Sequence, residues 1–143
     1  MTLNKSTRYA LLAALEMALA GGRPVTVGGV AARHGIPPTA LAKVFQTLVR
    51  AGIAVGSRGA GGGYRLARPR SAVSVLDVVT VFEPPRTTAA DAAGSQGDPG
   101  APSADWALRR LLHEVDELVR STYASVTLET FVRPAVSPQA PGR

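Results

Sequence analysis

The sequence predicts a mainly α protein of the α+β class with one small β-hairpin. Apolar residues recur at helical spacing in several segments, most clearly within residues 36–52 and 105–124. Residues 53–68 instead alternate apolar and small side chains around a run of glycines, a pattern typical of a β-hairpin. A chain of 143 residues is long enough to bury one core and short for two.

The first helix is predicted over residues 9–20, where alanine and leucine dominate, and Gly21 and Gly22 are expected to end it. A signal peptide is the alternative, because basic residues precede this apolar run. Glu16 interrupts the run, however, and the run is too short to span a membrane. We therefore expect a buried helix in a cytoplasmic protein that has no membrane partner.

A short extended piece at residues 25–27 precedes the second helix and could form a third strand beside the hairpin. The second helix is predicted over residues 27–34, with Val30 and Ala31 facing inward. His34 ends this helix, where we expect its ring to face the terminal carbonyl groups.

The third helix combines an apolar face with a polar and basic one. Pro37 and Pro38 suit its first turn, and Gly52 is placed to end it. The apolar face consists of Leu41, Val44, Phe45, Leu48 and Val49. The opposite face carries Thr39, Ala40, Lys43, Gln46 and Arg50. Short, polar and basic side chains suit a helix that lies against a polyanion.

The predicted hairpin turns at residues 59–63, with Arg58 entering the glycine tip and Arg65 leaving it. A helix, a glycine stop and a basic hairpin form the layout of a winged helix-turn-helix domain, which reads the major groove with the helix and the minor groove with the wing. A phosphate-binding loop does not fit, because Tyr64 stands where those motifs need a lysine or a glycine. A plain flexible hairpin tip remains the alternative.

The charge distribution points the same way. Residues 1–70 hold ten Lys or Arg and one acid, a net charge of +9, whereas residues 71–143 hold six Arg and nine acids, a net charge of −3. The basic excess therefore coincides with the half that carries the third helix and the hairpin, as nucleic-acid binding requires.

A fourth helix follows, which Ser74 caps together with Asp77 in a capping box. We expect the DNA-binding domain to end at residue 83. Residues 84–104 hold four Pro, three Gly and no large apolar residue, so they predict a flexible loop.

A long helix is predicted from a cap at Asp105 to about Ala124. Led by Trp106, its apolar stripe consists of Leu108, Leu111, Leu112, Val115, Leu118 and Val119. Twenty helical residues span about 30 Å, more than a small domain needs for its own core. We therefore expect this helix to pair with a second copy in a homodimer, with an intrachain core helix as the alternative. A short helix at residues 126–131 completes the segment 105–133, and residues 134–143 form a disordered tail.

Catalysis and metal binding find little support. The chain has no cysteine, which excludes disulfides, thiolate zinc sites and cysteine nucleophiles. His113 lies at helical spacing from Asp116 and Glu117 but lacks a third ligand, so a solvated helix face is expected. We predict no enzyme activity, no metal and no cofactor.

Several segments resemble the Rrf2 family of bacterial winged-helix regulators. They are residues 5–11 (Lys-Ser-Thr-Arg-Tyr-Ala-Leu), 34–36 (His-Gly-Ile), 48–53 (Leu-Val-Arg-Ala-Gly-Ile), 58–66 (Arg-Gly-Ala-Gly-Gly-Gly-Tyr-Arg-Leu), 73–79 (Val-Ser-Val-Leu-Asp-Val-Val) and 126–129 (Val-Thr-Leu-Glu). The resemblance implies a winged helix-turn-helix transcription regulator with a long dimerisation helix.

The sequence also departs from that family. In many members a loop before the dimerisation helix holds cysteines that ligate an iron–sulfur cluster, whereas residues 84–104 hold none. Arg8 and Leu12 do not offer the carboxylate or histidine that some members contribute. Ala40 and Ala42 stand where members often have a tyrosine and an acid. The resemblance therefore implies a cysteine-free member, which a protein partner or another ligand modulates.

The predicted DNA contacts divide by role. Thr39 and Ala40 could meet a thymine methyl group and Lys43 a guanine, with Gln46 a further candidate for a base edge. Arg58 is expected in the minor groove. The phosphate contacts are expected from Lys5, Arg8, Arg50 and Arg65.

These observations predict a homodimeric repressor that binds double-stranded DNA at a palindromic operator, with half-sites about one helical turn apart. One alternative is a protein-interaction module whose winged domain binds an acidic partner. Another is a ligand sensor with a pocket between the long helix and the winged domain.

Overall fold

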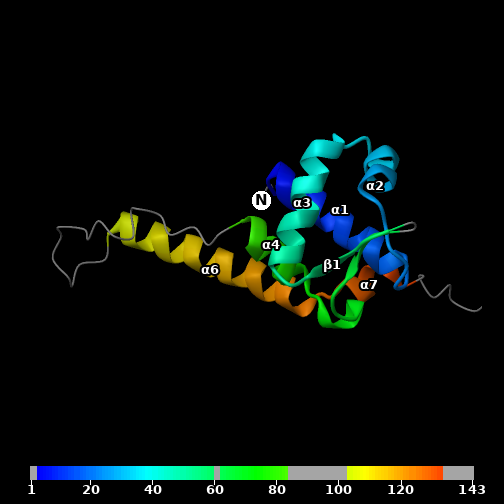
Figure 1. The fold of residues 1–143 in the computed structure, drawn as a ribbon. Helices are drawn as coiled ribbons and strands as arrows, with labels where there is room; N and C mark the ends of the chain where they lie inside the picture. The colour runs from blue at the N-terminus through cyan, green and yellow to red at the C-terminus, as the bar shows by residue number, and fades with distance from the viewer. Residues whose placement is uncertain (1–2, 60–61, 84–102, 134–143) are drawn as a thin grey trace, which may run out of the picture.

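The computed structural model describes residues 3–59, 62–83 and 103–133 (Figure 1). Its elements, in chain order, are α1 (Lys5–Leu19), α2 (Val27–His34), α3 (Pro38–Arg50), β1 (Ala54–Ser57), β2 (Gly63–Leu66), the 3-10 helix η1 (Arg70–Ala72), α4 (Val75–Phe82), α6 (Ala104–Ser125) and α7 (Leu128–Val132). The mainly α fold with one hairpin is confirmed. The predictions for residues 84–102 and 134–143 lie outside the described residues.

The core surrounds α1, which packs against α3, α4, α7 and β2. Ala10, Ala13 and Ala14 are fully buried on α1, and their small side chains let the neighbouring helices approach closely. The helix begins at residue 5, before the predicted residue 9, because the Asn4 side chain accepts the Thr7 N–H at 2.7 Å and caps it.

Asn4 also joins the beginning of α1 to the end of α4. Its backbone N–H donates to the Glu83 carboxylate at 2.7 Å, and its side-chain amide donates to the Phe82 carbonyl at 3.1 Å. Two segments almost eighty residues apart in sequence are thus held side by side. The sequence contains no local signal for this contact.

Helices α2 and α3 form the predicted helix-turn-helix. The Thr26 hydroxyl caps α2 by accepting the Gly29 N–H at 3.0 Å, and Gly35 ends the helix in the left-handed region, at a φ of 64°. Val30 and Ala31 are buried, as predicted.

The buried face of α3 consists of Leu41, Val44, Phe45 and Leu48, as predicted. Val49 was expected to complete this face, but 37% of its surface is exposed. The prediction for Val49 is therefore wrong. It lies at the edge of the apolar face in the last turn of the helix, just before the chain turns away at Gly52, whose φ is 76°.

The hairpin pairs β1 and β2 antiparallel, with Ala54 opposite Leu66 and Ser57 opposite Gly63. Val25 lies against the other edge of β2 and exchanges two backbone hydrogen bonds of 2.8 Å with Tyr64. The extended segment beside the hairpin is therefore present as a single bridge. It ties the wing to the segment that precedes α2.

Helix α4 begins with the predicted capping box, in which Ser74 and Asp77 each accept the other's backbone N–H, at 3.0 and 2.9 Å. Two other predicted boundaries are wrong. Helix α6 begins at Ala104 with Ser103 as its cap, ahead of the predicted cap at Asp105. The cause is the Ser103 hydroxyl, which accepts the Trp106 N–H at 3.2 Å.

The last helix begins at residue 128, two residues after the predicted position. Val126 and Thr127 are extended, because they pair with the segment before α4: Val75 N–H donates to the Val126 carbonyl at 2.8 Å, and Leu128 N–H donates to the Val73 carbonyl at 2.9 Å. These bonds attach the end of α6 to the winged domain.

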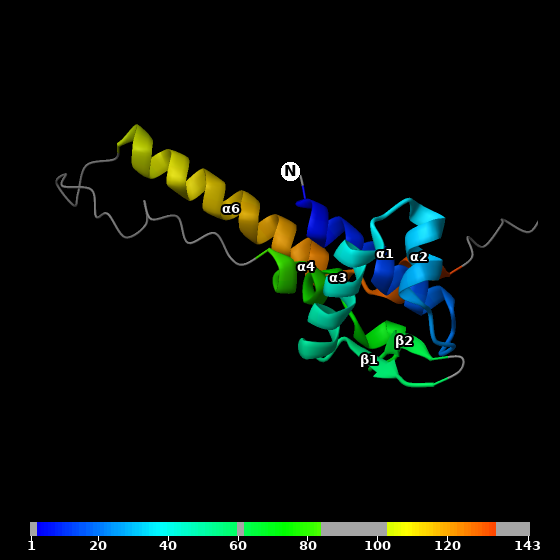
Figure 2. The ribbon, with the colours of Figure 1, turned by 45° about the horizontal axis from the view of Figure 1, so that its top comes forward.

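Helix α6 extends well beyond the rest of the described structure, which contacts mainly its C-terminal half (Figures 1 and 2). None of its residues is buried, and Leu108, Leu111, Leu112, Val115 and Leu118 are each between 45% and 68% exposed. Val119 is half-buried. Within the described residues, no helix is both long and apolar enough to cross a membrane.

Candidate nucleic-acid interface

The outward face of α3 is polar and basic. Thr39, Lys43, Gln46 and Arg50 are exposed, and Ala40 is half-buried. Since Leu41, Phe45 and Leu48 are fully buried on the other side, the helix is fixed in rotation about its axis. The predicted base-reading residues therefore share one accessible face.

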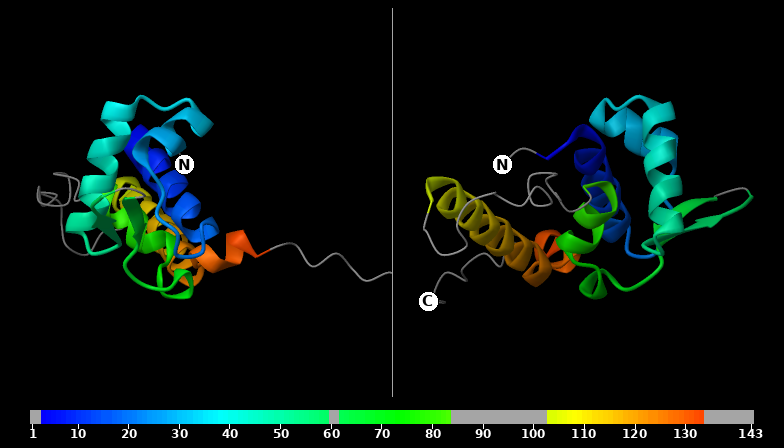
Figure 3. Two further views of the ribbon diagram at one scale, coloured as in Figure 1. Left: turned by 45° about the vertical axis from the view of Figure 1, so that its right-hand side comes forward. Right: turned by 90° about the vertical axis from the view of Figure 1, so that its left-hand side faces the viewer.

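The wing is attached to α3 by an aromatic contact. The rings of Phe45 on α3 and Tyr64 on β2 stack with centroids 4.6 Å apart and planes inclined by 20°. Arg58, which follows β1, and Arg65 on β2 are both exposed. The right-hand panel of Figure 3 shows α3 along one edge of the molecule, the hairpin projecting beyond that edge, and α6 on the far side.

Gly63 at the start of β2 is required by the close approach of the segment that contains Val25. A methyl group at Gly63 would lie 2.4 Å from the Val25 carbonyl oxygen. We expect Gly63→Ala to break the Val25–Tyr64 bridge, to destabilise the fold by about 1–3 kcal/mol and to weaken DNA binding through a displaced wing. Thermal unfolding and a DNA titration measure both effects.

Gly56 on the opposite strand provides the matched control. A methyl group there would meet the Tyr64 ring at 3.6 Å, an ordinary contact. Gly56→Ala should therefore change stability by less than about 0.5 kcal/mol. Equal effects of the two substitutions would show that the close approach to Val25 does not determine the position of the wing.

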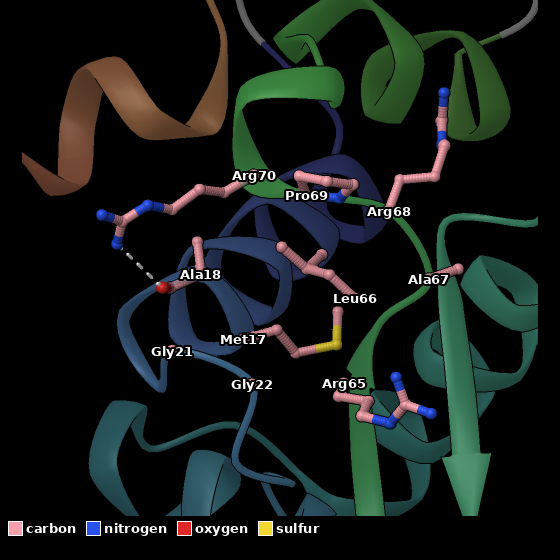
Figure 4. Close-up of a pocket in the computed structure, with 10 residues that line it drawn as sticks. All are labelled: Met17, Ala18, Gly21, Gly22, Arg65, Leu66, Ala67, Arg68, Pro69 and Arg70. Atoms are coloured by element: carbon pink, nitrogen blue, oxygen red, sulfur yellow. Dashed lines mark hydrogen bonds between the residues drawn. The ribbon is translucent and has the colours of Figure 1, made fainter.

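A hollow of about 510 Å³ lies at the base of the wing, between the end of α1 and the segment that follows β2. Its three arginines do not converge (Figure 4). Arg70 donates to the Ala18 carbonyl at 3.4 Å and Arg68 lies 3.8 Å from the Asp77 carboxylate, whereas Arg65 points away from both. Arg70 and Arg68 therefore tie the segment after β2 to α1 and α4. Because the three arginines point in different directions, the hollow does not form a site for an anion.

Lys5 and Arg8 are exposed in the first turn of α1. The Asn4 contacts with Phe82 and Glu83 hold this turn in place. The two basic residues thus lie on the winged body, whereas the predicted dimerisation residues all lie on α6.

Sequence reasoning missed the partners of a buried acid on α1. Glu16 on α1 is 8% exposed and accepts from Arg33 and from the His34 ring, whose Nε2 lies 2.8 Å from its carboxylate. His34 was expected to face the carbonyl groups at the end of its helix, and this prediction is wrong because its ring bonds to the carboxylate of another helix. An acid within an apolar helical run was the signal that a buried partner was needed. These contacts join α1 to the last turn of α2, just before the turn of the helix-turn-helix.

An exposed polar and basic reader helix beside a basic wing defines a DNA-binding winged helix-turn-helix protein. The Rrf2 family, described as iron-dependent transcriptional regulators, matches residues 3–134. The chain belongs to this family.

Individual relatives agree with this assignment. The chain is 35% identical over 133 residues to the HTH-type transcriptional regulator BadM of Rhodopseudomonas palustris. This match covers 93% of this chain and 82% of that protein. It is 32% identical to the HTH-type transcriptional regulator IscR of Yersinia enterocolitica, covering 92% and 79%.

Solved structures show the same fold. CymR, the global cysteine regulator of B. subtilis, superposes with a TM-score of 0.75 at 24% identity, covering 92% of this chain and 96% of that one. IscR of T. potens superposes with a TM-score of 0.77 at 24% identity, covering 100% and 94%.

The family description raises the question of iron. An iron–sulfur cluster is held mainly by cysteine thiolates, and this chain has no cysteine. Among the described residues, no group of three or more His, Asp or Glu side chains is placed to hold a metal ion. The side chains present therefore do not fit a thiolate-held cluster.

Proposed function

We propose that this protein is a homodimeric transcriptional repressor that binds a palindromic operator in the chromosomal DNA of the cytoplasm. The observation that carries the proposal is the placement of α3 and the wing along one edge of the molecule. On the far side, α6 exposes an apolar stripe. Two copies joined through α6 present two reader helices, which a two-fold-symmetric operator with half-sites about one helical turn apart would match.

The proposed contacts follow from exposure and chemistry. Thr39, Ala40, Lys43 and Gln46 would meet base edges from α3. Lys5, Arg8, Arg50 and Arg65 would meet phosphates, and Arg58 would enter the minor groove.

The test is to incubate the purified protein with sheared genomic DNA at moderate salt and to sequence the retained fragments. Enrichment of one two-fold-symmetric site is the expected result, and a reporter gene placed behind that site should be expressed more strongly when the protein is absent. Uniform retention of all fragments would contradict an operator-specific regulator and favour a sequence-blind basic surface.

Lys43→Ala is expected to relax sequence preference at one position in each half-site, because an exposed lysine on the reader face can donate to guanine O6 and N7. The loss on the preferred sequence should be about 1–3 kcal/mol. Arg50→Ala, in the last turn of the same helix, is the control and should weaken binding equally on all sequences. Selection of binding sites from a randomised library measures both. An unchanged preference would remove Lys43 from base reading.

Arg58→Ala is expected to weaken binding most on operators flanked by A·T pairs, because a narrow minor groove attracts an inserted arginine. Titrations against two operators that differ only in these flanking pairs measure the effect. Arg65→Ala, on the returning strand, should show no dependence on the flanks. The same loss on both operators for Arg58→Ala would reduce Arg58 to a phosphate contact.

A further inference from the structure

Glu16 is the only buried charged side chain within residues 3–59, 62–83 and 103–133. Its neighbours Ala14, Met17 and Ala18 on α1 are buried and apolar. A carboxylate at such a place has to be paired, and an apolar residue of similar volume often gives the same stability or more. Stability alone therefore does not account for an acid at this position.

The Glu16 carboxylate holds the last turn of α2 with both of its oxygens. Arg33 Nη1 donates to Oε2, and His34 Nε2 lies 2.8 Å from Oε1. Because a carboxylate can only accept, the ring nitrogen of His34 is the donor. Two directional bonds to consecutive residues restrict both the position of this turn and its rotation.

The apolar contacts of α2 do not restrict its last turn in this way. The buried side chains of this helix are Val30 and Ala31, and the next buried side chain is Ile36, after the helix has ended at Gly35. Apolar burial is non-directional. The bonds to Glu16 therefore orient the segment between Ala31 and Ile36.

This segment leads directly into the part of α3 that is proposed to read bases. Thr39, Ala40 and Lys43 lie in the N-terminal half of α3, whereas the Phe45–Tyr64 stack attaches the following part to the wing. The right-hand panel of Figure 3 shows the hairpin at the end of α3 opposite the turn that joins α2 and α3. The reading end of α3 is thus oriented from the side of α2.

We infer that Glu16 is a positioning residue for base recognition, which acts through Arg33 and His34 on the N-terminal end of α3. The inference rests on the proposed operator binding and adds to it a residue that is buried behind the reading surface. A hydrogen bond to a base edge is lost when its length grows from about 3 to about 3.6 Å. Attraction to phosphates acts over about 10 Å. A displaced reader helix therefore loses sequence preference before it loses affinity for DNA in general.

The test compares the full-length variants Glu16→Gln and Glu16→Met with the unmodified protein. Each is titrated against the operator and against a copy in which the most strongly preferred base pair of each half-site is changed. We expect the ratio of the two affinities to fall about tenfold in both variants, with little change on the altered copy. Glu16→Met should keep the stability of the fold, because its side chain is apolar and of similar volume. Urea unfolding measures that stability.

The ratio separates positioning from stability, because a less stable variant loses the same fraction of folded protein on both duplexes. Thr7→Ala is the matched control: Thr7 is also polar and buried on α1, but it bonds to Asn4 and not to α2. It should lower the stability and leave the ratio unchanged. His34→Gln keeps a donor for the Glu16 carboxylate and should retain the ratio, whereas His34→Ala should lower it.

An unchanged ratio in both Glu16 variants would overturn the inference and reduce these bonds to a stabilising contact, while operator binding would stand. If the unmodified protein bound all duplexes equally, the proposed operator binding would be contradicted, and the inference with it.

Discussion

Leu111→Asp is expected to convert the protein to a monomer and to lower its affinity for the operator by about 100-fold or more. Leu111 is 59% exposed near the centre of the α6 stripe, where a carboxylate would have to be buried between two helices without a partner. A monomer binds one half-site and loses the gain that comes from tethering the second reader helix. Sedimentation and an operator titration measure the two effects.

His113→Asp is the matched control for this prediction. It introduces the same carboxylate on the same exposed helix, but on the face opposite the stripe. Dimerisation and operator binding should remain close to those of the unmodified protein. A dimeric Leu111→Asp variant would show that α6 does not provide the interface.

Phe45→Ala is expected to cost about 3–5 kcal/mol of folding free energy, a large share of the roughly 5–15 kcal/mol that stabilises a typical domain. Phe45 is fully buried on α3 and stacks on Tyr64 of the wing. Its removal leaves a cavity and also detaches the reader helix from the hairpin. Urea unfolding of the full chain measures the loss, and a DNA titration below the unfolding transition measures any displacement of the wing.

Val49→Ala serves as the comparison on the same helix. Because 37% of Val49 is exposed, the substitution removes less buried surface and should cost under about 1 kcal/mol. If Phe45→Ala and Val49→Ala lost similar amounts of folding free energy, the burial of Phe45 and the partial exposure of Val49 would be contradicted.

Where the determinants are local, the sequence was sufficient to predict the structure. The capping box of Ser74 and Asp77, the stop at Gly52 and the helical spacing of Leu41, Phe45 and Leu48 each operate within a few residues. The winged helix-turn-helix fold was predicted from these signals and is confirmed. The residues proposed to contact DNA lie on accessible surfaces, and their roles stay predictions.

Features built from distant segments could not be predicted in this way. Glu16 on α1 forms a hydrogen bond with His34 on α2. Asn4, which precedes α1, forms hydrogen bonds with Phe82 and Glu83 at the end of α4. An apolar cavity of about 290 Å³ opens where α6 meets the winged body, and its walls come from several elements, whose packing no single stretch of sequence specifies. The exact end of a helix also depends on which of several neighbouring polar residues caps it. In α6 the cap is Ser103 and not Asp105.

The division of charge along the chain has a kinetic consequence. Residues 1–70, with a net charge of +9, include the reader helix and the wing, whereas residues 71–143, with a net charge of −3, include α6 on the far side. Such a molecule carries a dipole moment, and the field around a duplex exerts a torque on it before any contact is made. The protein would approach DNA already turned toward its binding side. Added salt shortens the range of that field and should slow association.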